Sequence, residues 1–479
     1  MTEGPSESAS SAVHEQLAHP VIDGDGHWLE PVPVFLDYLR DEGGLPAVQA
    51  FDELDARRRT WYEKSPAERQ GLRLGRPGFW GEPAGTLDRS TASLPGLIYE
   101  RLDEFGIDFA LIFPTLALVL RDIRDPDHRA SALRAINRMN AEMFAPYADR
   151  MTPVAAIPMA TPAYAIDEAT FAVRELGFKA IMTDGHITRV TEADPTRHYV
   201  DTFGLDSPFD YDPFFARCVE LGVAVSSHDG SIDWLDRRSP TNYVFNHLGH
   251  FAFGQHANCR ANFLGGLTRR FPDLNFAYLE GGVGWACNLI FDLVEHWEKR
   301  NTDALRANLR PTNVDVAEYR RLWERYAAPA LRDRFEEMVK SFSTFYPYMD
   351  PHELTDREVE SVDDFEALAI TSPEELRQEF RRNFYFGCEA DDRMTAVAFD
   401  ERLGALLKPV FSTDIGHFDV TDMSKVLADA WALVEDGLIT EENFEDFTFR
   451  NAVRLHGGMN PDFFKGTVVE RPAAALLAS

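Results

Sequence analysis

Short, nearly continuous apolar segments alternate with helical segments along almost the whole chain, and this alternation most constrains the fold. A segment such as IDFALIFP, which begins at Ile107, lacks the alternating polar positions of a half-exposed strand. It is typical of a parallel strand that is buried on both faces. Eight repeats of strand and helix predict a closed (β/α)₈ barrel, a TIM-type α/β fold, rather than an open doubly wound sheet. The eight segments begin at Pro20, Ile107, Met151, Phe178, Gly222, Leu274, Asn383 and Lys408.

Glycines mark the ends of two of the intervening helical segments. Gly177 and Gly222 each follow a leucine directly before the next apolar segment, where a helix commonly ends in a left-handed residue. No glycine-rich loop of the form GxGxxG or GxxxxGK follows an early strand. The sequence therefore argues against a nucleotide-binding sheet.

Two long insertions interrupt the predicted barrel, which we expect to form a single domain over residues 20–465. The first, about 30–99, is rich in Arg, Gly and Pro and contains GRPGFWGEP, and the second, about 295–382, is charged and helical in pattern. Barrel loops of this length usually shape the mouth of a site or a subunit contact. We expect lids here, and a homodimer contact through residues 314–339. Residues 1–19 and 466–479 are expected to be tails, the first of them flexible.

The charge of the chain excludes several classes of partner. Its 479 residues contain 48 Lys and Arg against 79 Asp and Glu, a formal net charge of −31. Such a charge repels phosphate backbones and anionic membranes, so we expect a small-molecule substrate and neither nucleic acid nor membrane as a partner. The four cysteines form no CxxC motif, and the polar N-terminus does not resemble a signal peptide. These features predict a cytoplasmic protein.

Polar side chains follow several predicted strands, at the end of a parallel barrel where all the strands open. Asp25 and His27 are two residues apart at the end of the first apolar segment and point the same way in an extended chain. His228 follows the fifth segment, Glu280 the sixth and Asp414 the eighth. Singly, each residue is more simply explained as a turn residue, a helix cap or a packed histidine. Together they favour a site for one divalent cation, zinc or manganese.

Other polar residues are weaker candidates for contacts with a substrate or with the metal ligands. His417 lies three residues after Asp414, and His247 and His250 are three residues apart in a segment that could form a wall of the site. Packing or a solvated surface position explains each of these residues equally well. The remaining weak candidates are His186, Arg189 and Arg393.

The sequence resembles the amidohydrolase superfamily, in the branch typified by aminocarboxymuconate-semialdehyde decarboxylase and γ-resorcylate decarboxylase. The resemblance covers about residues 21–457 apart from the two insertions. It implies metal ligands at Asp25, His27, His228 and Asp414. The matching stretches are VIDGDGHWLEP, MTPVAAIP, AIDEATFAVRELGFKAIM, CVELGVAVSSHDG, LTRRFPDLNFAYLEGGVGW, FSTDIGH and FRNAVRLHG.

One position departs from the pattern that this resemblance implies. The related proteins place a histidine, thought to act as acid and base, directly before the two glycines of the sixth strand, where this chain has Glu280. Asp25, Glu280 and Asp414 carry three negative charges, so one divalent cation leaves a charge of −1. That charge disfavours a carboxylate substrate unless a cation such as Arg189 or Arg393 compensates for it.

We therefore expect a metal-dependent hydrolase that acts on a small cyclic, acyl or 1,3-dicarbonyl-like substrate through metal-activated water. The alternative is non-oxidative decarboxylation of an aromatic or unsaturated carboxylic acid. A second alternative is a catalytically idle barrel that only binds a ligand. The catalytic residues of the hydrolase interpretation are Glu280, His228 and Asp414.

Overall fold

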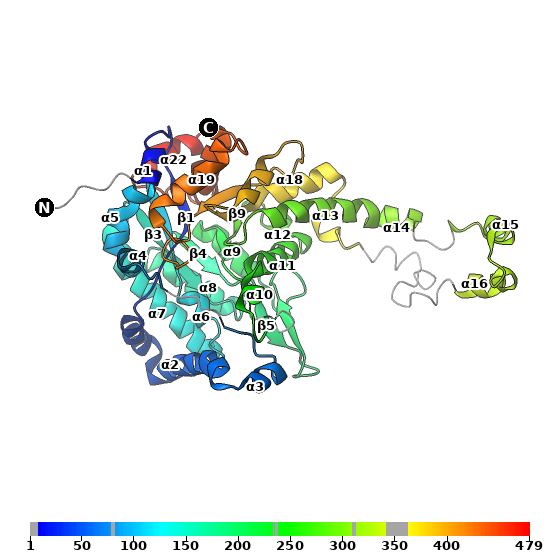
Figure 1. Cartoon of the computed structure of the whole chain (residues 1–479), viewed down its shortest axis with the longest axis horizontal. Coiled ribbons are helices and arrows are strands. Elements are labelled where there is room, and N and C mark those ends of the chain that lie inside the picture. The colour runs from blue at the N-terminus through cyan, green and yellow to red at the C-terminus, as the bar shows by residue number, and fades with distance from the viewer. Residues whose placement is uncertain (1–7, 78–81, 233, 235–237, 309–312, 342–362) are drawn as a thin grey trace. The chain divides into compact units, whose positions relative to one another are not determined.

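The chain consists of two compact units. The computed structural model describes residues 8–77, 82–232, 234, 238–308, 313–341 and 363–479. One unit comprises residues 1–289 and 379–479, and the other comprises residues 290–378. The first unit contains a sheet of eight strands (Figure 1), and every strand pairs in parallel with the next one in the sheet.

The strands form a nearly closed barrel. Beyond the last strand, the backbone N–H of Asp414 donates to the carbonyl of Asp25 at 2.9 Å, and the N–H of His27 donates to the carbonyl of Ile415 at 2.8 Å. The last strand is thereby joined to the first, which confirms the predicted TIM-type α/β fold. In sheet order the strands are β1 (Ile22–Trp28), β2 (Phe109–Pro114), β3 (Met151–Ile157), β4 (Ala180–Thr183), β7 (Val225–Ser227), β8 (Phe276–Tyr278), β9 (Phe384–Glu389) and β10 (Pro409–Ser412).

Helices surround the strands of the first unit (Figure 1). The predicted glycine cap is present at Gly222, which ends α9 with a φ of 69°. Helices α13 (Gly284–Arg300) and α18 (Pro373–Asn383) run across the boundaries between the units, and the second unit also contains α14 (Thr302–Asn308), α15 (Val316–Tyr326) and α16 (Phe335–Ser341). The helices of the first unit are α1 (Ala9–His14), α2 (Val32–Glu63), α3 (Pro66–Gly71), α4 (Thr86–Ser93), α5 (Pro95–Phe105), α6 (Ala117–Leu120), α7 (Pro126–Phe144), α8 (Pro162–Arg174), α9 (Asp212–Leu221), α10 (Tyr243–His247), α11 (His250–Leu264), α12 (Leu267–Arg270), α19 (Val426–Glu435), α20 (Glu441–Glu445), α21 (Asn451–Gly457) and α22 (Glu470–Leu477).

The sequence Asp-Gly-Asp-Gly-His lets β1 pack very closely against β10. A Cβ atom on Gly24 would lie 2.5 Å from Cγ1 of Val410, so only glycine fits there without displacing the neighbouring strand. The buried carboxylate of Asp23 accepts hydrogen bonds from the backbone N–H of Thr413 at 3.0 Å and from its hydroxyl at 2.6 Å. These contacts fix the seam of the barrel, which is the line along which β1 meets β10. They thereby also fix the positions of the polar residues at the ends of these strands.

Several segments differ from the sequence-based expectations. Part of the expected N-terminal tail forms α1, where the buried Ser10 hydroxyl accepts a hydrogen bond from the N–H of Leu427 at 3.0 Å, and part of the expected C-terminal tail forms α22. An antiparallel hairpin, β5 (Ile187–Val190) and β6 (His198–Asp201), follows β4 and was not predicted. Residues 78–81, within the GRPGFWGEP motif, and residues 342–362 of the second insertion lie outside the described residues.

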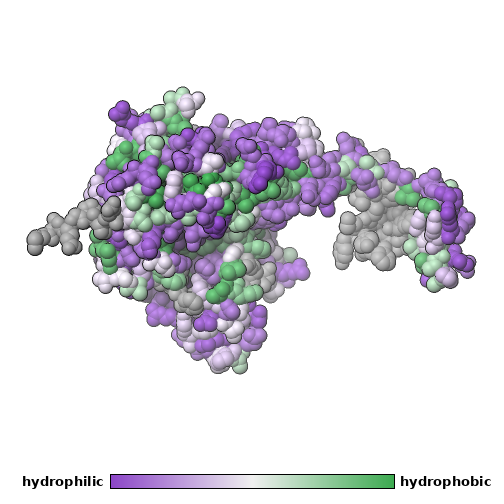
Figure 2. Space-filling model, turned by 45° about the horizontal axis from the view of Figure 1, so that its top comes forward, coloured by the Kyte–Doolittle hydropathy of each residue, from purple (hydrophilic) through white to green (hydrophobic). Residues whose placement is uncertain are grey.

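Hydrophilic residues cover most of the face shown in Figure 2, interrupted by small hydrophobic areas. Among the helices of the described residues, none combines the length and the apolar composition that a membrane span requires.

Candidate metal centre

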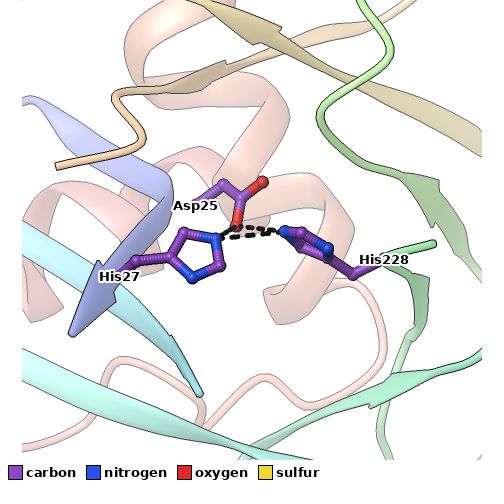
Figure 3. A group of neighbouring side chains, drawn as sticks. All are labelled: Asp25, His27 and His228. Carbon is purple, nitrogen blue, oxygen red and sulfur yellow. Dashed lines mark hydrogen bonds and ion pairs between the residues drawn. The ribbon is translucent and has the colours of Figure 1, made fainter. Parts of the chain in front are cut away.

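Five buried or nearly buried side chains from four strand ends converge on one point at the mouth of the barrel. Nε2 of His27 lies 3.3 Å from Oδ1 of Asp25 and 3.1 Å from Nε2 of His228 (Figure 3). Nε2 of His228 lies 3.4 Å from Oε2 of Glu280, and Nε2 of His27 lies 3.5 Å from Oδ1 of Asp414. The structure therefore brings the four predicted metal ligands together with Glu280, the predicted catalytic residue.

The backbone places two of the carboxylates in an unusual conformation. Glu280, which follows β8, has a φ of 56°, and Asp414, which follows β10, has a φ of 55°. Residues other than glycine rarely adopt positive φ because the Cβ atom crowds the backbone, and such strain is concentrated at functional sites. In both cases the turn aims a carboxylate at the two histidines.

The converging atoms have the properties of metal ligands. Oδ1 of Asp25, Oε2 of Glu280 and Oδ1 of Asp414 are buried and have no hydrogen-bond partner in the described part of the chain. Buried carboxylate oxygens without partners are costly, and a cation among them would remove that cost. Three carboxylates and two neutral imidazoles suit a single divalent cation such as zinc or manganese. The buried group of His and Asp side chains therefore fits a metal site.

Burial and mutual repulsion shift the pKa values in this group. Burial raises the pKa of Glu280 well above its usual value, and the charges of Asp414 and Asp25 raise it further. Burial lowers the pKa of His27 to about 4, and His417 adds to this effect, so the imidazole of His27 is neutral at pH 7. The pKa of Asp25 is lowered because His228 and His27 outweigh the effect of its burial. A divalent cation would favour the ionised form of the carboxylates that bind it.

Two further polar residues, Thr115 and His417, contact two of the five converging side chains. The hydroxyl oxygen of Thr115, which follows β2, lies 3.1 Å from Nδ1 of His27 and 3.3 Å from Nε2 of His417. Nδ1 of His417 lies 2.6 Å from Oδ2 of Asp414, as its position three residues later in the sequence suggests. Sequence reasoning missed Thr115, since nothing distinguishes one threonine at a strand end from any other.

A cavity of about 240 Å³ opens on this group. Glu280, Thr115 and His417 line it, and His247 and His250 stand in its wall, as considered from the sequence. Two cations in the wall were not predicted. Arg58 belongs to α2 in the first insertion and is exposed. Its guanidinium has no ion-pair or hydrogen-bond partner in the described part of the chain. Arg121 follows α6 and forms an ion pair with Asp229.

Three weaker candidates lie elsewhere than expected. The guanidinium of Arg189 donates to the buried carboxylate of Asp201 at 2.6 Å and to the Tyr211 hydroxyl at 3.0 Å, which is a structural role in the β5–β6 hairpin. Arg393 is exposed and pairs with Asp436 at 2.6 Å. Neither arginine lines the cavity, so the expectation that they compensate its charge is wrong. His186 lies behind the cavity wall.

The contacts of His186 are with residues that shape the wall. Its Nε2 accepts a hydrogen bond from the indole N–H of Trp234 at 2.7 Å. Its Nδ1 lies 2.7 Å from Oδ2 of Asp229, the cavity residue that also pairs with Arg121. His186 therefore supports the residue next to His228 and does not belong to the converging group.

Comparison with known proteins is consistent with this architecture. An amidohydrolase from Mycobacterium avium subsp. paratuberculosis K-10 is 16% identical, with a TM-score of 0.53 and coverage of 92% of this chain and 100% of that one. A dihydroxybenzoic acid decarboxylase from Polaromonas sp. JS666, solved with manganese and an inhibitor, is 15% identical, with a TM-score of 0.49 and coverage of 91% and 97%. A 5-carboxyvanillate decarboxylase from Sphingomonas paucimobilis is 16% identical, with a TM-score of 0.49 and coverage of 92% and 99%. At this level of identity, the first likeness supports the fold alone.

The sequence itself gives the stronger result. No curated protein matches it. A model of the amidohydrolase family matches residues 22–383, which include six of the eight barrel strands and four of the five converging side chains. The chain therefore belongs to the amidohydrolase family.

Proposed function

We propose that the protein is a metal-dependent lyase that removes carbon dioxide, without oxidation, from a small aromatic acid with a hydroxyl group beside its carboxylate. The observation that carries this proposal is the position of Arg58 in the wall of the cavity that Glu280 also lines. Hydrolysis was expected from the sequence because a site with a net charge of −1 disfavours a carboxylate substrate. Arg58 supplies the positive charge that such a substrate requires, since the charge of Arg121 is already paired with Asp229.

The cation would be held by Asp25, His27, His228 and Asp414, with Glu280 beside them. When bound, a divalent ion would draw the substrate's carboxylate and hydroxyl oxygens together and stabilise negative charge that develops on the ring. Zinc and manganese both suit these oxygen and nitrogen donors.

The shape of the cavity limits the substrate. Its volume of about 240 Å³ is below the roughly 300–1,000 Å³ of most ligand pockets, so a molecule with one ring fits the proposal best. Leu118, Ile232 and Phe251 give the wall an apolar surface for the ring. Arg58 binds the end of the substrate that carries the negative charge, and thereby orients the ring over the converging side chains.

The chemical step requires a proton donor. When the carboxylate leaves as carbon dioxide, the electron pair of the broken C–C bond stays on the ring carbon, which must then accept a proton. Glu280 lines the cavity beside the cation site, and its pKa is raised by burial and by Asp414 and Asp25. A carboxyl group that holds its proton near neutral pH can deliver it to that carbon.

Hydrolysis is the second candidate, and the identity of residue 280 favours it. A glutamate beside a metal site can accept a proton from water, and Oε2 of Glu280 is buried without a hydrogen-bond partner in the described part of the chain. In that reaction Arg58 would bind a polar group of the substrate and would not be essential for charge compensation.

The two reactions are separated by their products. Protein loaded with manganese or zinc is incubated in D₂O with hydroxybenzoates, and in H₂¹⁸O with lactones and esters. We expect release of carbon dioxide and one deuterium on the ring carbon that carried the carboxylate. Incorporation of ¹⁸O into products of lactones or esters, with no release of carbon dioxide from any acid, would establish hydrolysis instead. No turnover, together with less than one equivalent of metal, would indicate a barrel that only binds.

A further inference from the structure

A chain of hydrogen-bonding groups links two of the converging side chains, His27 and Asp414, through Thr115 and His417. Asp414 contacts Nδ1 of His417 at 2.6 Å, Nε2 of His417 contacts the Thr115 hydroxyl at 3.3 Å, and this hydroxyl contacts Nδ1 of His27 at 3.1 Å. All four residues are buried, with at most 8% of each exposed. The chain joins the ends of β10, β2 and β1.

The donors and acceptors in this chain can be assigned from its first member. With a cation bound at Oδ1, Asp414 is ionised and only accepts hydrogen bonds, so Nδ1 of His417 then donates to it. Nε2 of the neutral His417 ring is then an acceptor, and the Thr115 hydroxyl must give it its single proton. The remaining contact of the hydroxyl oxygen is with Nδ1 of His27, which therefore donates to it. As a result, Nε2 of His27 carries a lone pair.

We propose that Thr115 is a positioning residue, which holds His27 in the tautomer whose Nε2 is free to bind a cation and takes its own orientation from Asp414 through His417. Nε2 is the nitrogen that faces Asp25 and His228. Asp414 thus has two roles. Its Oδ1 faces the cation site, and its Oδ2 sets the tautomer of His27 through His417 and Thr115. The proposal rests on the proposed metal site but not on the reaction.

The fold holds Thr115 in place for this role. The backbone N–H of the next residue, Leu116, donates to Oε2 of Glu30 at 2.9 Å, and Glu30 lies two residues beyond the end of β1. The turn after β2 is thereby tied to the strand that carries His27. This tie fixes the threonine hydroxyl relative to the imidazole it contacts.

The same assignment predicts how many cations the protein binds. His27, Asp414 and His417 lie close enough together to form a second group that could hold an ion. In the proposed chain, however, both ring nitrogens of His417 are engaged, by Asp414 and by Thr115. We therefore expect one cation per chain rather than two.

The first test compares Thr115→Val, which keeps the shape of the side chain but removes the hydroxyl, with Thr115→Ser, which keeps the hydroxyl. The dissociation constants of Mn²⁺ and Zn²⁺ are measured by calorimetry on the full-length apo protein. We expect roughly 10- to 100-fold weaker binding for T115V, as is usual when such a contact is lost. We expect binding within about threefold of the wild type for T115S. Equal affinity of T115V and the wild type, in variants with unchanged thermal unfolding, would overturn the proposal.

The second test observes the Nδ1 proton of His27 directly. Two-dimensional ¹H–¹⁵N spectra of histidine-labelled, zinc-loaded protein report this proton and its exchange with water. The proton should exchange slowly in the wild type and in T115S, where the hydroxyl of residue 115 accepts it, and faster in T115V. The double variant T115V/H417F should bind metal no more weakly than the weaker single variant, because both substitutions break one chain. Equally fast exchange in the wild type and T115V, additive losses, or two bound cations would contradict the proposal. None of these measurements depends on the reaction that the enzyme performs.

Discussion

At the scale of single residues, the charge of Arg58 separates the two candidate reactions. If Arg58 binds the substrate carboxylate, Arg58→Met should raise the KM for a hydroxybenzoate by about 10- to 100-fold, the usual range for a lost hydrogen bond to a charged group. The matched control is Arg59→Met, since Arg59 is on the same helix but is exposed and pairs with Asp55. Steady-state kinetics measure both variants. An unchanged KM in R58M, or an equal rise in R59M, would remove the argument for a carboxylate substrate.

The residues of the site differ in how far the sequence reveals them. Asp25, His27, His228, Glu280 and Asp414 could be predicted because each directly follows or ends a buried apolar segment, and parallel strands bring such ends together. Thr115 sits at an equivalent strand end but has a side chain common at any turn. Arg58 could not be predicted, since its position depends on how a helix of the first insertion folds over the barrel mouth. Long-range packing of this kind leaves no periodic pattern in the sequence.

At the scale of elements, the glycines of β1 allow the barrel to close. Gly24→Ala would place a methyl group 2.5 Å from Cγ1 of Val410 and 3.1 Å from the carbonyl oxygen of Phe411. Relief of that clash requires β1 and β10 to separate, so we expect the free energy of unfolding to fall by about 1–3 kcal/mol. In the control, Gly71→Ala, the new methyl group meets nothing within 4 Å. Urea unfolding should show G71A to be no less stable than the wild type, and an equally stable G24A would contradict this view of the seam.

Glu30 connects β1 to the turn after β2, and it predicts a pH dependence of stability. Burial raises the pKa of this carboxyl group to about 8, against an ordinary value of 4.5. Between these two pH values, Glu30 keeps its proton in the folded protein but loses it on unfolding. Stability from this group is therefore complete below about pH 4.5 and falls as the pH rises towards 8.

The variant Glu30→Gln mimics the protonated carboxyl group and should lack this dependence. Urea unfolding of both proteins at pH 5, 7 and 8.5 gives the comparison. The wild type should lose a few kcal/mol relative to E30Q across this range, since each unit of pKa shift corresponds to about 1.4 kcal/mol. Parallel stability curves for the two proteins would show that Glu30 ionises freely in the folded state.

Buried helices and strands were easier to predict from the sequence than exposed ones. All eight barrel strands were located because each lies in a largely buried segment that contains a short apolar run, which is longest in strands such as β2. The β5–β6 hairpin was missed because its strands are partly exposed and carry His, Arg and Thr side chains, which give no apolar run. Helix α1 was missed because its short polar sequence is ordered by contacts with α19, distant in the chain.

At the scale of the whole molecule, the unit formed by residues 290–378 exposes apolar side chains of α15. Val316 and Tyr326, at the two ends of α15, are 44% and 67% exposed, and α15 has no buried residue among those described. Apolar side chains left exposed together commonly mark a contact surface. We therefore retain the sequence-based prediction of a homodimer through residues 314–339.

Light scattering of the full chain should give about twice the monomer mass of 54.2 kDa. The double variant Val316→Glu/Tyr326→Glu should be monomeric, because two charges would be buried in the contact. The control Val468→Glu, at a position that is 53% exposed in the first unit, should remain dimeric. A wild-type protein of monomer mass at high concentration would exclude the dimer, and an unchanged mass of the double variant would place the contact elsewhere.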